Sequence, residues 1–371
     1  MVYTNKNFFF TSESVCSGHP DKICDQISDA ILDEVLKQDP EGRVAVETVA
    51  CFNKLFLAGE VTAKTKVNFK KIAQAQIKRL GYINPEWNFS DQSPIEVVIH
   101  EQSSEIAVGV DEMGAGDQGM MFGFACKDTQ NCMPLPINLA HSLAERIDFV
   151  RENKTLNYLR PDGKTQVTVE YKNGQPVKVV KVVVAVPHNE KISLHQVKED
   201  IYQQVVKSVL GEFGFRLSSK DLIVNGTGVW HKGGPASDSG LTGRKIVVDT
   251  YGGFARVGGG AFSGKDPTKV DRSGAYAARF IAKNLVANNL AEKVEVALAY
   301  FIGAKKPLME EIETFGTAKT SQKVIKDFVR KIIDTSVAGI IKTLDLRRPI
   351  YLKTASYGHF GRPDFPWEKV V

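Results

Sequence analysis

The chain lacks a long apolar run and a large excess of either charge. Its most apolar stretch, residues 179–186, is interrupted by Lys181 and is far too short to span a bilayer. The 48 basic and 43 acidic residues leave a formal net charge of only +5 over 371 residues. That balance does not require a nucleic-acid partner, because a local basic cleft for a small anion explains it equally well. We therefore expect a soluble protein that engages neither a membrane nor a nucleic acid.

Cysteine is also scarce, and the five residues form no Cys-x-x-Cys pair: Cys16, Cys24, Cys51, Cys126 and Cys132. An odd number cannot be bridged completely within one chain, and the first residues show no signal-peptide pattern. These absences predict a cytoplasmic protein whose thiols mostly pack in the interior.

Apolar periodicity predicts helices and hairpins in alternation. After Pro20, isoleucine or valine at every fourth position predicts a helix over 21–38. Further helices are expected over 67–80, 136–153, 193–210, 272–288 and 321–333. Strands are expected over 8–10, 95–100, 246–249 and 294–302, with hairpins over 43–62 and, around Asn173-Gly174, between 166 and 187. Hairpins with helices between them favour an α+β fold, with mixed or antiparallel sheets covered by helices on one face, over a parallel doubly wound sheet.

One glycine-rich stretch, GGGAFSGKDPTKVDRS, carries the strongest chemical signal. Gly259 to Lys265 has the spacing of a phosphate-binding loop, in which glycine N–H groups approach phosphate oxygens. Asp266 follows where such a loop places a Ser or Thr hydroxyl, which argues against ordinary NTPase chemistry. Lys265 and Lys269 supply cations, while Asp266 and Asp271 supply carboxylates of the kind that magnesium on a polyphosphate requires. The stretch therefore predicts a polyphosphate site.

A second cluster, GHPDK, stands at the start of the first expected helix. A helix N-terminus attracts anions, His19 can donate a hydrogen bond to a ligand oxygen, and Asp21 can hold a metal. The alternative is that Asp21 is an ordinary first-turn acid and His19 a surface residue. Asp25 and Asp29 follow on the same helix face, and we interpret them as solvated or salt-bridged rather than as further ligands.

Two turns add cations to this set. Arg244 and Lys245, in GLTGRK, resemble ordinary exposed charge, but the glycine-rich stretch follows within about twenty residues, as a strand and its return would arrange. Asp238 just before them can accept from a ribose hydroxyl or an ammonium group. Lys164 follows Asp162 in a DGK turn, although turn chemistry alone explains this sequence.

Other motifs have a second interpretation. GAGDQG spells a dinucleotide fingerprint, but a strand-like MMFGFA follows it instead of a helix, so we discount it. Trp230, after a glycine turn, either stacks on a base or packs in the core. Glu47 and Glu60 lie in an alternating hairpin, where an acid usually faces solvent.

Together these pieces resemble S-adenosylmethionine synthetase, or methionine adenosyltransferase, over essentially the whole chain. The matching segments, in the order of the family, are GHPDK at 18–22, GAGDQG at 114–119, LRPD at 159–162, GLTGRK at 240–245, DTYGG at 249–253, the glycine-rich stretch at 258–273 and YGHFGR at 357–362. The resemblance implies synthesis of S-adenosylmethionine from ATP and L-methionine. The methionine sulfur would attack C5′ and expel the whole triphosphate, which the same site would hydrolyse to pyrophosphate and phosphate.

The resemblance also implies roles for individual residues. The catalytic residues, acting on the triphosphate of ATP, would be His19 near the bridging oxygen, Lys164, Arg244, Lys245 and Lys265. ATP would further contact Asp162, Val229, Trp230, Asp238 and Ala261. Methionine would contact Glu60, Gln102, Asp238 and Lys269. Asp21 and Asp271 would bind Mg²⁺, two ions per site, and Glu47 would bind K⁺, one ion per subunit.

Members of this family have three similar α+β domains and work as a homodimer or homotetramer. The implied ranges are 1–101, a mobile gating loop at 102–113, 114–233, and 234–371 with the glycine-rich loop. The family's active sites lie between subunits, which would explain how Glu60 and Lys265 can be remote within one chain.

The chain departs from the family pattern in two places. The usual Asn-Pro-Thr-Gly-Arg-Phe reads NGTGVW at 225–230, and the usual Ser-Pro-Asp-Ile after Gln102 reads SSEI. We expect these changes to affect how adenine is held and how the gating loop closes.

Two other functions fit parts of the sequence. A phosphotransferase would use the glycine-rich loop as an NTPase does, but Asp266 argues against it. A non-catalytic nucleotide-binding subunit would be expected to lose some metal or triphosphate residues, yet Asp21, Arg244, Lys265 and Asp271 are all present.

Overall fold

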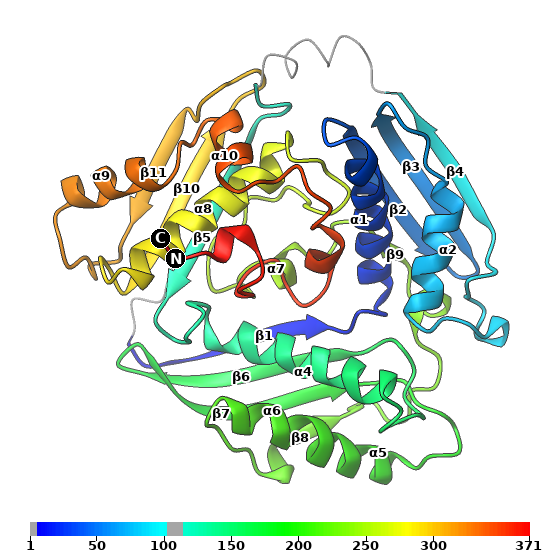
Figure 1. Cartoon of the computed structure of the whole chain (residues 1–371). Coiled ribbons are helices and arrows are strands. Elements are labelled where there is room, and N and C mark those ends of the chain that lie inside the picture. Colours follow the sequence, from blue (N-terminus) through cyan, green and yellow to red (C-terminus); the bar gives the residue numbers. More distant parts are fainter. Residues whose placement is uncertain (1–5, 102–113) are drawn as a thin grey trace.

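The computed structural model describes residues 6–101 and 114–371. Gln102 and the gating loop expected at 102–113 lie outside the described residues. The described chain forms three β-sheets, arranged around a common centre with helices against them (Figure 1). The predicted α+β class, with mixed and antiparallel sheets, is confirmed.

Each sheet takes strands from more than one part of the chain. The N-terminal sheet contains, in spatial order, β4 (Ile95–His100), β3 (Lys54–Thr62), β2 (Arg43–Cys51) and β9 (Gly240–Leu241). The central sheet contains β1 (Phe8–Val15), β6 (Lys164–Lys172), β7 (Gln175–Ala185) and β8 (Leu222–Val224). The C-terminal sheet contains β11 (Met309–Glu313), β10 (Lys293–Tyr300) and β5 (Gly119–Cys126).

The three sheets share one plan. Each is built on a hairpin, β2–β3, β6–β7 or β10–β11, whose first strand pairs antiparallel with a strand from another region, β9, β1 or β5. In two sheets a further strand runs parallel to the second hairpin strand, β4 beside β3 and β8 beside β7. The three domains are therefore similar. Each is connected to another region of the chain through the strand, β9, β1 or β5, that pairs with its hairpin.

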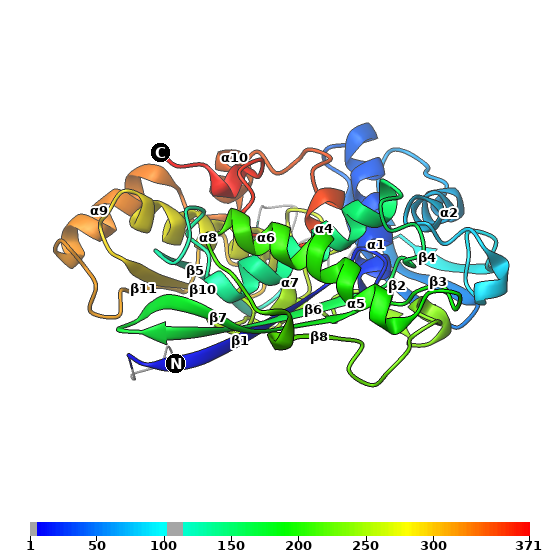
Figure 2. The same cartoon turned by 90° about the horizontal axis from the view of Figure 1, so that it is seen from below.

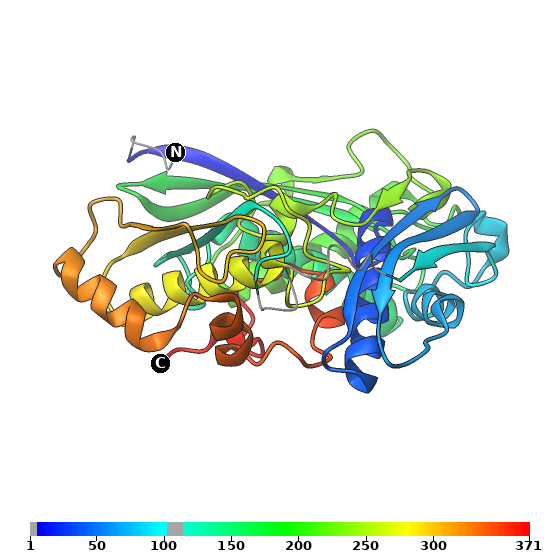
Figure 3. The same cartoon turned by 90° about the horizontal axis from the view of Figure 1, so that it is seen from above.

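Helices cover one face of the sheets. They are α1 (Pro20–Gln38), α2 (Phe69–Arg79), α4 (Leu135–Glu152), α5 (Leu194–Ile201), α6 (Lys207–Glu212), α7 (Ile246–Asp249), α8 (Val270–Ala287), α9 (Gln322–Ile332) and α10 (Val337–Thr343). Helix α1 packs on β2, α4 on β1 and β6, and α8 on β5 and β10. Figures 2 and 3 show the strands of all three sheets towards one side of the molecule and these helices on the other.

Local sequence explains α1 directly. Pro20 occupies its first turn, where a missing N–H is harmless, and His19 is the N-cap. The predicted stripe of Ile23, Ile27, Ile31 and Val35 is fully buried. The opposite side is buried too, so α1 is a central helix rather than a surface helix.

The predicted hairpin at Asn173-Gly174 is confirmed, with both residues at positive φ (52° and 76°), as a two-residue turn between twisted strands requires.

The strand expected at 246–249 is wrong, because this segment is the short helix α7, in which Asp249 N–H donates to Lys245 O (2.8 Å). A short apolar run has no period that distinguishes a buried strand from a buried helical turn. The helix expected at 193–210 is interrupted by a π-helical turn (Tyr202–Val206).

The C-terminal segment fills the centre between the three domains (Figure 1). Trp367 is fully buried and stacks on Tyr276 of α8, with ring centroids 3.6 Å apart. The buried guanidinium of Arg279 donates to both carboxylate oxygens of Glu368 (2.9 Å each). These contacts hold the C-terminal segment against α8.

All five cysteines are free thiols, and four of them are buried, as predicted. Within residues 6–101 and 114–371, no helix combines the length and apolar character needed to cross a bilayer.

Close packing of β5 on α8 predicts a strong effect of one methyl group. A Cβ at Gly123 would lie 2.0 Å from the backbone carbon of Ala278, so Gly123→Ala must push β5 from α8 and should destabilise the protein by about 1–3 kcal/mol. Gly211 in α6 has no such neighbour within 4 Å, so the control Gly211→Ala should be neutral or slightly stabilising. Thermal unfolding of both variants checks this, and equal midpoints would contradict the packing argument.

Candidate active site

Residues from separate segments meet along one edge of β2. On this edge Val49 and Ala50 pair with β9, while Ala45 forms a bridge to Lys265 and Val46 N–H donates to Gly264 O (3.1 Å). The GLTGRK loop and the glycine-rich stretch are therefore neighbours. The GLTGRK loop lies against the start of α1, because a Cβ at Gly240 would stand 2.1 Å from Pro20 O. The glycine-rich stretch lies against the middle of α1, where Gly264 N–H donates to Asp29 (2.8 Å).

His19 presents an unpartnered donor at this place. The side chain is buried, and its Nδ1 accepts from the backbone N–H of Asp21 (3.2 Å), which assigns the ring proton to Nε2. Nε2 has no hydrogen-bond partner among the described residues. Burial, together with the charges of Lys245 and Lys164, lowers the pKa of His19 to about 3. The ring is therefore neutral near pH 7 and has one N–H to offer a ligand acceptor.

Asp21 is held between the loop backbone and a lysine. Its Oδ1 accepts from Leu241 N–H (3.0 Å), and its Oδ2 lies 2.5 Å from Lys245 Nζ, while Arg244 Nε is 3.9 Å from the same carboxylate. Burial acts to raise the pKa of Asp21, but the bonds from Lys245 and Leu241 outweigh it and the pKa is lowered. Asp21 is therefore an ionised carboxylate with two cations beside it, rather than an ordinary first-turn acid.

A second carboxylate–lysine pair lies on the glycine-rich side. Lys265 Nζ is 2.5 Å from Asp271 Oδ2. A Cβ at Gly260 would stand 2.3 Å from Asp271 Cγ, so only glycine lets the loop backbone pass so close to this carboxylate. The two loops also touch, since a Cβ at Gly243 would stand 2.3 Å from Ala261 Cβ.

The DGK turn closes the site on the central-domain side. Asp162 is buried and accepts from Gly163 N–H (2.7 Å) and Gly234 N–H (2.8 Å), so it holds the chain before Asp238 in place. Burial raises the pKa of Asp162 to about 6, with Lys164 opposing the shift and Asp238 adding to it. The charge of Lys164 also lowers the pKa of His19.

The expectation that Glu60 and Lys265 are remote within one chain is wrong. Ala45 of β2 pairs with Glu60 of β3 on one edge and bridges Lys265 on the other. The three residues therefore lie side by side across the sheet. Desolvation raises the pKa of Glu47, with Lys265 lowering it and Asp25 and Glu60 raising it, so Glu47 belongs to the same charged group.

The remaining sequence candidates lie at the borders of this region. Lys269 is the N-cap of α8 and pairs with Asp266, whose buried carboxylate also accepts from Val44 N–H (2.8 Å). Asp266 therefore ties the loop to β2, and both of its carboxylate oxygens already accept hydrogen bonds. Val229 is exposed, and Trp230 lies outside the buried core, with its Nε1–H donating to Lys232 O (2.6 Å).

Sequence reasoning missed the buried ion pairs behind the site. Lys22 Nζ lies 2.5 Å from Asp249 and 2.9 Å from Asp25, and Arg272 forms a bidentate pair with Asp29 (2.7 Å for both bonds). Of the two interpretations of Asp25 and Asp29, the salt-bridged one is confirmed and the solvated one is wrong. The i, i+4 spacing on α1 placed them on one face but carried no information about burial.

This arrangement suits a divalent cation only when a bound ligand supplies further oxygen atoms to the ion. In the described part of the chain, no group of three or more His, Cys, Asp or Glu side chains is placed to hold a metal ion. Asp21 and Asp271 are separate carboxylates, each beside one lysine. Mg²⁺ is commonly held by one or two carboxylates together with water and substrate phosphates, so these two residues suit it when a polyphosphate is bound.

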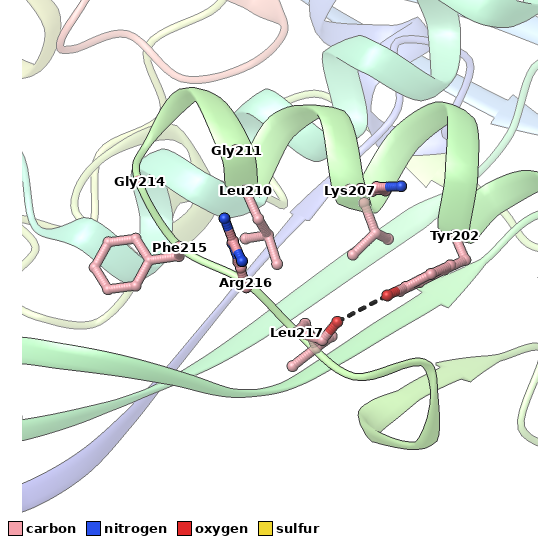
Figure 4. Close-up of a pocket in the computed structure, with 9 residues that line it drawn as sticks. Tyr202, Lys207, Leu210, Gly211, Gly214, Phe215, Arg216 and Leu217 are labelled. Atoms are coloured by element: carbon pink, nitrogen blue, oxygen red, sulfur yellow. Dashed lines mark hydrogen bonds between the residues drawn. The ribbon is translucent and has the colours of Figure 1, made fainter.

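A cavity of about 630 Å³ lies elsewhere, between the helical residues 202–211 and the segment 214–217 (Figure 4). Tyr202 O–H donates to Leu217 O (3.0 Å) across it. None of the candidate site residues lines this cavity.

Comparison with protein families gives three consecutive matches. Residues 7–104 match the N-terminal domain of S-adenosylmethionine synthetase, residues 112–230 its central domain, and residues 232–369 its C-terminal domain. The matches follow the order of the family and cover nearly the whole chain.

The cation cluster predicts tight binding of a polyphosphate. Lys245→Met should raise the dissociation constant of inorganic tripolyphosphate with Mg²⁺ about tenfold or more, since one charge-assisted hydrogen bond contributes about 1.5–3 kcal/mol. Asp21 keeps its bond from Leu241, so the fold should persist. The matched control is Lys181→Met, because Lys181 of β7 is also paired with an aspartate, Asp221. Calorimetric titration measures both, and an unchanged affinity of the Lys245 variant would refute the site.

Proposed function

The chain belongs to the S-adenosylmethionine synthetase family and is a methionine adenosyltransferase, and we propose that it joins ATP and L-methionine in the site described above. The methionine sulfur attacks C5′ of ATP and expels the whole triphosphate. The same site then hydrolyses the triphosphate to pyrophosphate and phosphate. The observation that carries this proposal is the arrangement of Lys245 and Lys265, each paired with a carboxylate, on two loops along one edge of β2, with the unpartnered Nε2–H of His19 next to Asp21.

The chemistry of the nucleophile explains why cations dominate. A thioether is uncharged and carries no proton to remove, so the step needs no general base. The barrier depends on negative charge that accumulates on the leaving triphosphate, and fixed cations in a dry pocket stabilise that charge. Lys164, Arg244, Lys245 and Lys265 serve this role. His19 donates a hydrogen bond from its Nε2–H to the bridging oxygen without adding a charge.

Metal ions are used by this family, and we assign two Mg²⁺ to Asp21 and Asp271 and one K⁺ to Glu47. When bound, Mg²⁺ would neutralise triphosphate oxygens and orient them for departure. Asp21 and Asp271 supply hard oxygen ligands and hold Lys245 and Lys265 beside the same phosphates.

Methionine and adenosine are assigned to the borders of the site. Glu60, Gln102, Asp238 and Lys269 hold methionine, and Asp162, Val229, Trp230, Asp238 and Ala261 contact ATP. The position of Glu60 beside Lys265 supports this, because it brings the acid that would bind the methionine ammonium to the cation that would bind the triphosphate. We further assign the segment 102–113 as the loop that gates entry.

We assign the protein to a homodimer or homotetramer in the cytoplasm, with active sites between subunits. Each sheet exposes a large apolar side chain on the face away from its helices: Phe9 on β1, Val98 on β4 and Met120 on β5. A second copy would cover such a surface. A mass measurement in solution distinguishes a dimer from a tetramer.

The phosphotransferase alternative loses support in the structure. An NTPase loop needs a hydroxyl after its lysine to hold magnesium. Here Asp266 fills that position, and its carboxylate is used by Val44, Thr268 and Lys269.

One assay tests the proposed function. The purified protein is given ATP, Mg²⁺, K⁺ and methionine, and the products are followed. Formation of S-adenosylmethionine with release of pyrophosphate and phosphate, dependent on methionine, supports the proposal. Production of ADP would indicate the phosphotransferase, and binding without turnover would indicate a non-catalytic subunit.

Two substitutions test the assigned roles. Lys265→Ala and Asp271→Asn should each slow adenosyl transfer about 10²- to 10³-fold, because each removes one group that stabilises the developing charge. Both side chains are only partly buried, so the fold should survive. Initial rates at saturating substrate measure the loss, circular dichroism confirms folding, and near-normal turnover of either variant would contradict its role.

A further inference from the structure

Four aspartates on α1 each accept backbone N–H groups from a distant segment. Asp21 accepts from Leu241 (3.0 Å), Asp25 from Gly243 (2.8 Å), Asp29 from Gly264 (2.8 Å), and Asp33 from Tyr351 (2.9 Å) and Leu352 (2.8 Å). The spacing of four residues places these carboxylates on one face of the helix, one turn apart. We call them the aspartate ladder.

Two members of the ladder hold the loops that carry the cations. Gly243 directly precedes Arg244 and Lys245, and Gly264 directly precedes Lys265. Asp25 and Asp29 are fully buried, and a hydrogen bond from an N–H to an ionised carboxylate is about twice as strong as one between neutral groups. Each loop is therefore anchored one residue before its first cation.

A buried cation lies against each of these two carboxylates. Asp25 lies 2.9 Å from Lys22 Nζ, and Asp29 accepts both bonds of the Arg272 guanidinium. Arg272 also donates to Lys265 O (3.2 Å), so the second loop is held at two consecutive residues.

We propose that Asp25 and Asp29 are positioning residues that fix the separation between Arg244–Lys245 and Lys265. They do not touch substrate. They set two loops on one rigid helix, one turn apart, so that cations from both loops reach the same triphosphate. This inference rests on the proposed function. It means that the face of α1 behind His19 and Asp21 sets the distance between the cations of the two loops.

Asp33 provides a matched control on the same helix. It makes two N–H hydrogen bonds of the same kind, but to a segment that carries none of the candidate site residues. Its loss should reduce stability without moving the cations.

Asp25 is the member to substitute. Without Asp25, Lys22 keeps its partner Asp249 at 2.5 Å, so no buried charge is abandoned. Substitution of Asp29 would leave the buried Arg272 guanidinium without its carboxylate partner, so it would test folding rather than the position of the loop.

The experiment compares Asp25→Ala, Asp25→Asn and Asp33→Ala with the unsubstituted protein. Asp25→Ala frees Gly243, and we expect the dissociation constant of inorganic tripolyphosphate with Mg²⁺ to rise about tenfold and kcat to fall about 10- to 100-fold. Asp25→Asn retains an acceptor oxygen and should recover both values to within about threefold. Asp33→Ala should lower the unfolding temperature but leave both values within about twofold of the unsubstituted protein.

Two results would overturn the inference: unchanged tripolyphosphate affinity in Asp25→Ala, or an equal loss in Asp33→Ala at a similar unfolding temperature. Hydrogen exchange in the unsubstituted protein tests it without any variant. The Gly243 and Gly264 amides should exchange as slowly as those of α1, and rapid exchange would contradict the anchoring. If the unsubstituted protein makes no S-adenosylmethionine, the proposed function fails, whereas the tripolyphosphate comparison still decides the role of Asp25.

Discussion

The buried pair between Arg272 and Asp29 is the contact on which the rest of the site depends. Both side chains are completely buried, and their two parallel hydrogen bonds join α8 to α1. The same two groups bind the backbone at Gly264 and Lys265. Three segments that carry Asp21, Asp271 and Lys265 thus meet at one ion pair. Such a pair is costly to desolvate, so its value lies in specifying one arrangement rather than in adding stability.

The interlocked sheets explain why a single chain can bring such distant segments together. β9 crosses to the N-terminal sheet just before Arg244 and Lys245, and β1 runs in the central sheet just before His19. When a strand pairs with a hairpin of another domain, that sheet fixes the register of the strand. The loop that follows the strand therefore starts from a defined position. His19, Arg244 and Lys245 follow these two strands within a few residues. Their positions therefore depend on strand pairing between domains rather than on flexible linkers.

Sequence was a good guide where the signal is local. The apolar stripe of α1 and the Asn173-Gly174 turn each reflect a constraint that a few neighbouring residues express by themselves. Contacts between distant residues left no such trace. Nothing near Asp29 in the sequence indicates Arg272, and strand pairing alone places Glu60 beside Lys265. The helix at Ile246–Asp249 was missed because a run of four residues is too short to show a helical period.

The pairing of charges in the site has a consequence for how ligands enter it. Lys245 lies against Asp21, and Lys265 lies against Asp271, so each of these two lysines, which we assign to the triphosphate, already neutralises a carboxylate assigned to magnesium. A polyphosphate alone would have to draw the lysines away from their carboxylates and leave these unpaired. Mg²⁺ alone would displace the lysines in the same way. When both arrive, every charge gains an opposite partner, which favours entry of the nucleotide as its magnesium complex. His19 fits this balance because it is neutral, and it donates a hydrogen bond without altering the count of charges.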